Sequence, residues 1–485
     1  MKKNLVILLL PFIISCSINL EPEIYTNISP STFPKTVEDV EAAVTSIYDG
    51  IRADGFNTTF QVAAGGVNIW PEAATDIMTC QWGSYWPSLY SMTWTVNTSQ
   101  VTGTFRRYNL ISRGTLTIHR IQDVDMDPIL KNRYIAEIKC INAWIAWILY
   151  DLYGPIPIAP LEVLLNPQEE VILERPTTEW MVDYISSNLL EAVDHLPSFY
   201  ESHNWGRVTK GTALMLLLKL YMHEKEWSKA EEIARKIIGL EYYTLIPDYS
   251  SIFSKENQRN REIIYAIPLN LKTGNMWHAH VMPYNLPTTN PNITKWSGYR
   301  MRWDFYDTFE PTDQRLKTIV AEYVGTDGVV YNRENKSTYL EKGVIPVKYG
   351  EDPEQTGENS SIDLILFRYA DVLLSLSEAI ANKNGLPTQE CIELINSVRR
   401  RAGLNDLSLS DYTNLPDFNT MILLERGHEL FFEGGRRQDM IRNNTYIDFA
   451  RTIPGNQAAD YKKLFPLPQS VINEGKGIIH QNPGY

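Results

Sequence analysis

Three glutamates with helical spacing are the clearest candidates for catalysis. Glu425, Glu429 and Glu433 lie at i, i+4 and i+8 in the segment ERGHELFFEGGRRQDMIR, so on a helix they would share one face. Pairs of carboxylates perform acid–base catalysis in glycosidases, but those pairs flank the sugar from opposite sides. Carboxylates on a single helix, among Arg and Asp neighbours, favour a structural network of ion pairs. An extracellular hydrolase that uses this cluster is the alternative.

Histidine patterns that could bind a metal are incomplete. His428 and Glu429 begin like the HExxH motif of zinc proteases, but Phe432 stands where the second histidine is required. His278 and His280 could touch one ion from a strand, although the sequence shows no third ligand for it. No Gly-rich phosphate loop follows a strand, and no GxSxG motif is present. We therefore expect no catalytic residue, no metal site and no cofactor.

Aromatic residues are abundant, with 12 Trp and 27 Tyr in 485 residues. They gather in two segments of weak periodicity, around 76–94 and 277–303, which also contain amide and charged side chains. Rigid rings beside fixed polar groups are typical of a ligand-binding surface, although any single Trp is more often packed inside a protein. The candidate ligand-binding residues are Asp76, Gln81, Trp82, Tyr85 and Trp86 in the first segment, and Trp277, Trp296, Tyr299 and Trp303 in the second.

The elements that must position these segments are mostly helices. Residues 37–51 predict the first helix, with Thr36 as its cap and Asp39 as the acidic residue three positions later. Apolar residues recur at helical spacing in many further segments, and tight joints between neighbours favour antiparallel pairs. The predicted helices are 105–121, 132–153, 178–196, 208–223, 227–240, 368–381, 388–402 and 421–442, the last interrupted at Gly434 and Gly435.

Two irregular portions, about 54–103 and 241–363, interrupt this pattern. They are rich in Gly, Pro, Asn and aromatic residues, and long loops in a compact domain are usually functional. Within the second portion, 263–268 and 344–348 predict short strands. Because a lone helix pair cannot bury its apolar face, the pairs should stack into one scaffold that carries the irregular portions. We expect a mostly α fold in which residues 36–485 form a single globular domain.

The composition argues against one class of binding partner. The net charge of -13 argues against nucleic acid, because phosphate binding requires clustered Lys and Arg. Hydrophobic residues at 44% and charged residues at 21% are ordinary for a globular protein. Cys80, Cys140 and Cys391 are widely spaced, which favours buried free thiols over a disulfide framework.

The first residues have the layout of an export signal. Two lysines, an apolar stretch of about ten residues and a small residue before Cys16 follow the usual order, and the stretch is too short to span a bilayer. Ser15-Cys16 resembles the lipobox of bacterial lipoproteins, with Ile13 where Leu is commoner. We expect a signal peptide over 1–15, lipidation of Cys16 and a tether over 16–35. Ordinary secretion, with Cys16 incidental, is the alternative.

Six blocks resemble the SusD/RagB-like outer-membrane proteins of Bacteroidetes, and they occur in the family's order over most of the chain. They are DLYGPIPIA at 151–159, GRVTKGTALMLLLKLYMHEKEWSKA at 206–230, FRYADVLLSLSEAIA at 367–381, INSVRRRAGL at 395–404, ERGHELFFEGGRRQDMIR at 425–442, and the terminal LPQSVIN with QNPGY.

The resemblance implies a fold of tetratricopeptide-like helix pairs with an irregular, ligand-binding part. It also implies a cell-surface outer-membrane lipoprotein that captures a glycan without catalysis and delivers it to a SusC-like TonB-dependent transporter. Sugars suit the aromatic candidates, because pyranose rings stack on Trp and Tyr while hydroxyls require amide and charged groups. Oligopeptide capture, as in RagB-type proteins, is the alternative within the family. A helical-repeat adaptor with protein partners only is the alternative outside it.

Overall fold

The structure is a computed structural model, and it describes residues 33–52, 59–62, 66–335 and 339–485. The predicted signal peptide, Cys16 and most of the tether therefore lie outside the described residues. None of the helices in the described ranges is both long enough and apolar enough to span a bilayer.

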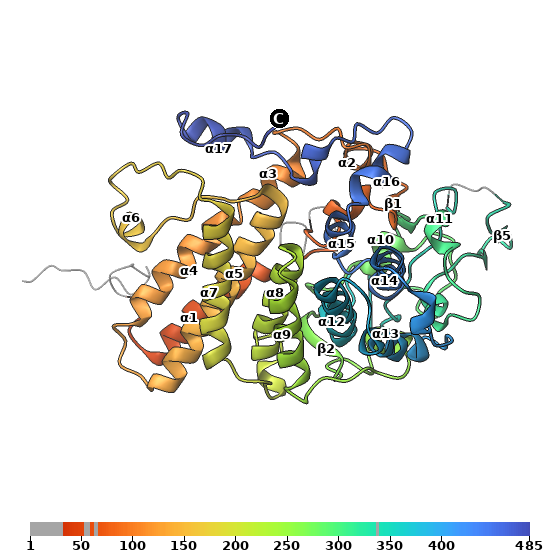
Figure 1. The fold of residues 1–485 in the computed structure, drawn as a ribbon, viewed down its shortest axis with the longest axis horizontal. Helices are drawn as coiled ribbons and strands as arrows, with labels where there is room; N and C mark the ends of the chain where they lie inside the picture. The colour runs from red at the N-terminus through yellow and green to blue at the C-terminus, as the bar shows by residue number, and fades with distance from the viewer. Residues whose placement is uncertain (1–32, 53–58, 63–65, 336–338) are drawn as a thin grey trace, which may run out of the picture.

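Antiparallel helices packed side by side form one half of the molecule (Figure 1). Along this row each helix packs on the next, and α12 packs on α9 although more than 100 residues separate them in sequence. This arrangement confirms the predicted scaffold of stacked helix pairs. The row consists of α4 (Tyr108–Ile121), α5 (Pro128–Tyr153), α7 (Thr178–His195), α8 (Lys210–His223), α9 (Trp227–Ile238), α12 (Tyr369–Asn384) and α13 (Gln389–Arg401), with α1 (Val37–Tyr48) packed on α4 and α5.

Local sequence explains where these helices begin. Thr36 and Asp39 form the predicted capping box of α1, in which each side chain accepts a hydrogen bond from the other residue's backbone N–H. The predicted helix 37–51 ends its α-helical part at Tyr48 and continues as a 3₁₀ turn, Asp49–Ile51. In α5, Asp127 caps the helix and Pro128 fills the first position, so this helix begins earlier than predicted.

The other half contains short strands, short helices and one longer helix, α14. Three antiparallel pairs join β1 (Met78–Cys80) to β3 (Tyr299–Met301), β2 (Ile263–Ile267) to β6 (Leu364–Arg368), and β4 (Tyr323–Val324) to β5 (Val330–Tyr331). The helices of this half and of the connections are α2 (Trp86–Tyr90), α3 (Ser99–Phe105), α6 (Leu161–Leu165), α10 (Trp277–Val281), α11 (Trp303–Tyr306), α14 (Leu415–Leu430), α15 (Arg436–Arg442), α16 (Tyr446–Thr452) and α17 (Gln469–Glu474).

Two predictions of secondary structure were wrong in detail. The segment 344–348 is no strand, because only Val344 and Ile345 make isolated bridges, to Met301 and Val320. The predicted helix 421–442 is two helices, α14 and α15, because the chain turns through left-handed conformations at Phe432 and Gly434. The three cysteines are buried and free, as predicted.

Candidate functional site

Pairing of β1 with β3 brings the two aromatic segments together. Cys80 lies opposite Tyr299 and Met78 opposite Met301, and the pairing continues one residue further because Gln81 N donates to Gly298 O at 2.8 Å. Residues more than 200 positions apart in the sequence therefore share one surface. We use the term aromatic surface for Gln81, Trp82, Tyr85 and Trp296, which all remain partly exposed at this end of the strand pair.

The Trp82 indole is held in a fixed position. Its Nε1 donates to the backbone oxygen of Trp296 at 3.0 Å, which ties the two tryptophans of the surface to each other. Its ring lies directly on Gly298, where a Cβ atom would stand only 2.5–2.7 Å from three ring atoms. Only glycine leaves room for the ring at this position. A ring fixed in this way loses little conformational entropy when a ligand stacks on it.

Three of the predicted ligand-binding aromatics do not reach the surface. Trp86, Trp277 and Tyr299 are 1%, 2% and 0% exposed. Their rings form a layer beneath the aromatic surface, with ring centroids of Trp82 and Trp86 at 5.6 and 5.3 Å from that of Tyr299. Burial of these large rings stabilises the fold and excludes them as ligand contacts in this conformation.

The buried His280 completes this supporting layer. Its ring stacks on Tyr299 with the centroids 5.2 Å apart and meets the edge of Trp296 at 4.9 Å. His280 Nδ1 lies 2.9 Å from the carbonyl oxygen of Met276, and a carbonyl can only accept, so Nδ1 carries the proton. Burial lowers the pKa of His280 to about 4, so the ring is neutral near pH 7. The structure thus gives His280 a packing role.

Polar groups surround the aromatic surface. Gln81 Nε2 donates to Tyr339 O at 3.0 Å, which fixes the amide while its oxygen stays available to a ligand. Lys342 Nζ donates to Cys80 O at 2.8 Å, and Lys295 Nζ donates to Leu286 O at 2.6 Å. Sequence reasoning missed Lys342, because it lies in neither aromatic segment and no motif marks it.

Arg300 holds together the segments beneath the aromatic surface. It is completely buried, and its guanidinium donates to the carbonyl oxygens of Tyr339, Val281 and Tyr299 at 2.6–2.7 Å and to Ser297 Oγ at 2.7 Å. All of these acceptors are neutral, and burial lowers the pKa of Arg300 to about 10. The arginine thereby joins the segments around 281, 297–299 and 339 beneath the aromatic surface.

The structure separates Asp76 and Trp303 from the other candidates. Both lie beyond the opposite end of the β1–β3 pair. Asp76 accepts two hydrogen bonds from Arg436, at 2.8 and 2.6 Å, so its carboxylate is already engaged. Trp303 donates to Leu340 O at 2.8 Å, and the guanidinium of Arg333 lies 4.8 Å from its ring centroid. Arginine therefore covers one face of this ring.

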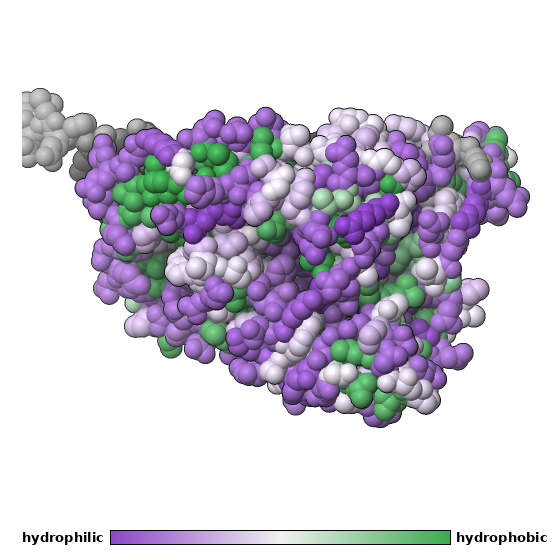
Figure 2. All heavy atoms as spheres, turned by 45° about the horizontal axis from the view of Figure 1, so that its top comes forward, coloured by the Kyte–Doolittle hydropathy of each residue, from purple (hydrophilic) through white to green (hydrophobic). Residues whose placement is uncertain are grey.

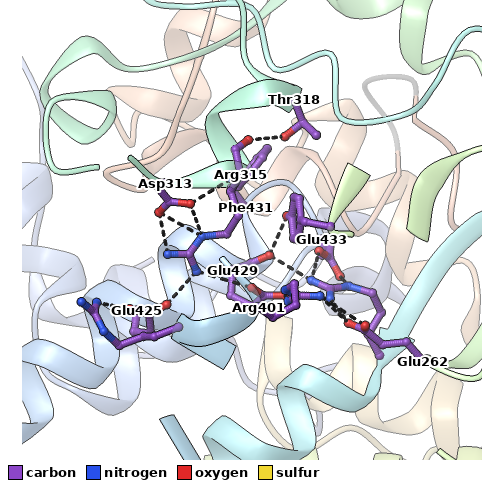
Figure 3. Close-up of polar contacts among 12 residues, drawn as sticks. Glu262, Asp313, Arg315, Thr318, Arg401, Glu425, Glu429, Phe431 and Glu433 are labelled. Atoms are coloured by element: carbon purple, nitrogen blue, oxygen red, sulfur yellow. Dashed lines mark hydrogen bonds and ion pairs between the residues drawn. The ribbon is translucent and has the colours of Figure 1, made fainter. Parts of the chain in front are cut away.

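The glutamates at 425, 429 and 433 form the structural network favoured by their spacing (Figure 3). Arg315 contacts Glu425 at 2.7 Å, and Arg368 contacts Glu429 and Glu433, each at 2.8 Å. Arg401 also pairs with Glu429. Burial alone would raise the pKa of Glu429, but the guanidinium groups of Arg401, Arg368 and Arg315 outweigh it and hold that pKa well below its usual range. A buried carboxylate with three arginine partners is poorly suited to donate a proton to a glycosidic oxygen.

Comparison with known proteins agrees with this architecture. A model of the SusD family matches residues 294–485. SusD-like protein P38 of Formosa agariphila is 24% identical, over 93% of this chain and 92% of that protein. Starch-binding protein SusD of Bacteroides thetaiotaomicron is 23% identical, over 82% of this chain and 81% of that protein.

A solved structure of a laminarin-binding SusD-like protein superposes with a TM-score of 0.77. It is 21% identical, and the match covers 93% of this chain and 100% of that structure. The similarity establishes that the two share a fold. The chain is thus similar to SusD-like proteins: the family model matches its C-terminal part, the relatives are 23–24% identical, and the solved structure shares its fold.

Proposed function

We propose that the protein binds a glycan at the aromatic surface and does not cleave it. The observation that carries the proposal is the Trp82 indole, which is fixed by Gly298 and by the Trp296 carbonyl while it remains partly exposed. Trp82, Tyr85 and Trp296 would stack on pyranose rings, and Gln81, Lys342 and Lys295 would bind hydroxyl groups. Two of the proteins named above are described as binding laminarin and starch, which favours a glycan over an oligopeptide.

The cellular role follows from the family resemblance. We infer that Cys16 is lipidated, that the protein lies on the outer surface of the outer membrane, and that a SusC-like TonB-dependent transporter receives the glycan. The engaged carboxylates of the network around Glu429 support binding without catalysis. A hydrolase would need two free carboxyl groups on opposite sides of a sugar.

The test is affinity electrophoresis of the purified protein in gels that contain laminarin, starch or other polysaccharides. We expect retardation by at least one of them, and loss of it in Trp82→Ala and Trp296→Ala. Trp180→Ala is a matched control, since Trp180 is 45% exposed on α7 and belongs to neither aromatic segment. If the Trp82 and Trp296 variants migrate as the wild type does, the aromatic surface is not the binding site.

A further inference from the structure

A hollow lies where the turn between α8 and α9 meets α12, α14 and the junction of α15 and α16. It is a cavity of about 470 Å³, a size typical of pockets for small molecules. We call it the α14 groove and define it by Lys225, Trp227, Asn382, Asn419, Asn443 and Asn444. None of these residues belongs to the aromatic surface. Figure 2 shows one face of the molecule, which is mostly hydrophilic with separate hydrophobic patches.

The groove has hydrogen-bonding capacity that the described parts of the chain do not use. Three side-chain groups of the groove form no hydrogen bond within the described parts of the chain: Trp227 Nε1, Lys225 Nζ and the amide of Asn444. Asn443 donates to Asp439 O at 3.0 Å, which leaves its own oxygen available to accept. The groove therefore offers donors and acceptors beside the indole of Trp227, which lines the cavity.

The rest of the groove is rigid. Asn382 and Asn419 form a reciprocal amide pair, with nitrogen–oxygen distances of 3.0 and 3.1 Å. At the bottom, Arg442 binds both oxygens of Glu378 at 2.7 Å, so these two charges neutralise each other. Leu423 adds an apolar contact to the lining. A ligand would meet groups that are already in place, which lowers the entropy cost of binding.

Two residues of the groove have an unusual backbone. Lys225 and Asn444 both have φ of +58°, in the left-handed region that most side chains avoid. They come from different segments, the α8–α9 turn and the α15–α16 junction, yet both line the same cavity. Each residue directly follows the C-cap of a helix, α8 or α15, where a left-handed residue is a common way for a helix to end, so the two helix ends place these side chains at the cavity.

We propose that the α14 groove is a second saccharide-binding site, separate from the aromatic surface. A sugar unit fits its chemistry because each hydroxyl both donates and accepts, and because the ring can pack on Trp227. The choice of a saccharide over another polar ligand rests on the proposed function. Two sites on one protein would hold a long glycan more tightly than either site alone.

The experiment is calorimetric titration with laminarihexaose and with maltohexaose, together with gel retardation by laminarin and starch. Glycine is the best substitute at the left-handed positions, because Lys225→Gly and Asn444→Gly remove the side chain and keep the backbone conformation. Trp227→Ala removes the indole, and Trp180→Ala is the control for loss of a partly exposed tryptophan. Thermal unfolding of each variant shows whether it is folded.

We expect two binding sites per molecule in the wild type and one in Trp227→Ala or in the double glycine variant. For the polysaccharide, removal of the groove should weaken the apparent affinity about tenfold or more. The groove proposal is overturned if the wild type binds neither hexasaccharide, or if it binds at one site that Trp82→Ala abolishes and the groove variants leave unchanged. Binding that survives Trp82→Ala but disappears in the groove variants would instead refute the aromatic surface and support the groove.

Discussion

Replacement of Gly298 by alanine tests the aromatic surface with a single added methyl group. That methyl carbon would lie 2.5–2.7 Å from three atoms of the Trp82 ring, closer than carbon atoms can approach. Gly298 is not in the left-handed region, so alanine suits its backbone and the clash with the ring is the main effect. The indole must therefore move away, and the hydrogen bond from Nε1 to Trp296 O must lengthen or break.

The size of the effect follows from these contacts. Overpacking costs about 1–3 kcal/mol of unfolding free energy, and the lost hydrogen bond adds about 1 kcal/mol. A displaced ring no longer stacks on the sugar as before. We expect glycan binding to weaken by about 1.5–3 kcal/mol, which corresponds to roughly a 10- to 100-fold rise in Kd.

The assay is calorimetric titration of Gly298→Ala with an oligosaccharide of the polysaccharide that retards the wild type. Gly83→Ala is a matched control on the residue next to Trp82, because a Cβ atom there would meet no other atom within 4 Å. Acrylamide quenching of tryptophan fluorescence reports on movement of the indole without any ligand. Unchanged affinity in Gly298→Ala, or an equal loss in Gly83→Ala, would refute the idea that the fixed Trp82 ring binds the glycan.

Four further predictions concern the residues beneath this surface and the candidate residues that lie apart from it. Arg300→Met should lower the unfolding free energy measured with urea by about 2–4 kcal/mol, because three buried acceptors lose the guanidinium as a donor. Glu429→Gln should cost about 3–5 kcal/mol in the same measurement, yet the folded variant should bind glycan as the wild type does. Burial lowers the folded pKa of His280 to about 4, below its unfolded value of about 6.5. The contribution of the neutral ring to stability is therefore present above pH 6.5 and is lost as the pH falls toward about 4. His280→Phe should flatten this part of a plot of unfolding free energy against pH. Trp303→Ala should leave the Kd for glycan unchanged in calorimetry, and a large rise would restore Trp303 as a ligand contact.

Features that depend on neighbouring residues could be predicted from the sequence. The capping box of Thr36 and Asp39 follows from spacing alone, as does the buried face of α1. The glutamates at i, i+4 and i+8 indicated a shared helical face, but only Glu425 and Glu429 lie on α14, which ends at Leu430. The arginines that bind the three glutamates come from distant segments. Helix periodicity also predicted the scaffold, because each helix must bury its apolar stripe against another.

The joining of the two aromatic segments could not be predicted in the same way. β1 and β3 have three residues each, which is too short for alternating polarity to specify register or partner. Trp82 and Trp86 would share a face if both lay on one helix, but α2 begins only at Trp86. Trp86 therefore points into the core while Trp82 stays at the surface, and residue type alone cannot distinguish them.

The buried Arg300 shows how an irregular half can hold a rigid surface. Short strands and loops provide few regular hydrogen bonds, so carbonyl groups in them need other donors. One guanidinium supplies donors to four acceptors on three segments, and its planar shape fixes their relative positions. A carboxylate partner would neutralise the charge but would occupy the donors that hold these segments together. Within the described part of the chain its hydrogen-bond acceptors include no acidic group, which is consistent with Arg300 acting as the structural centre of the aromatic surface.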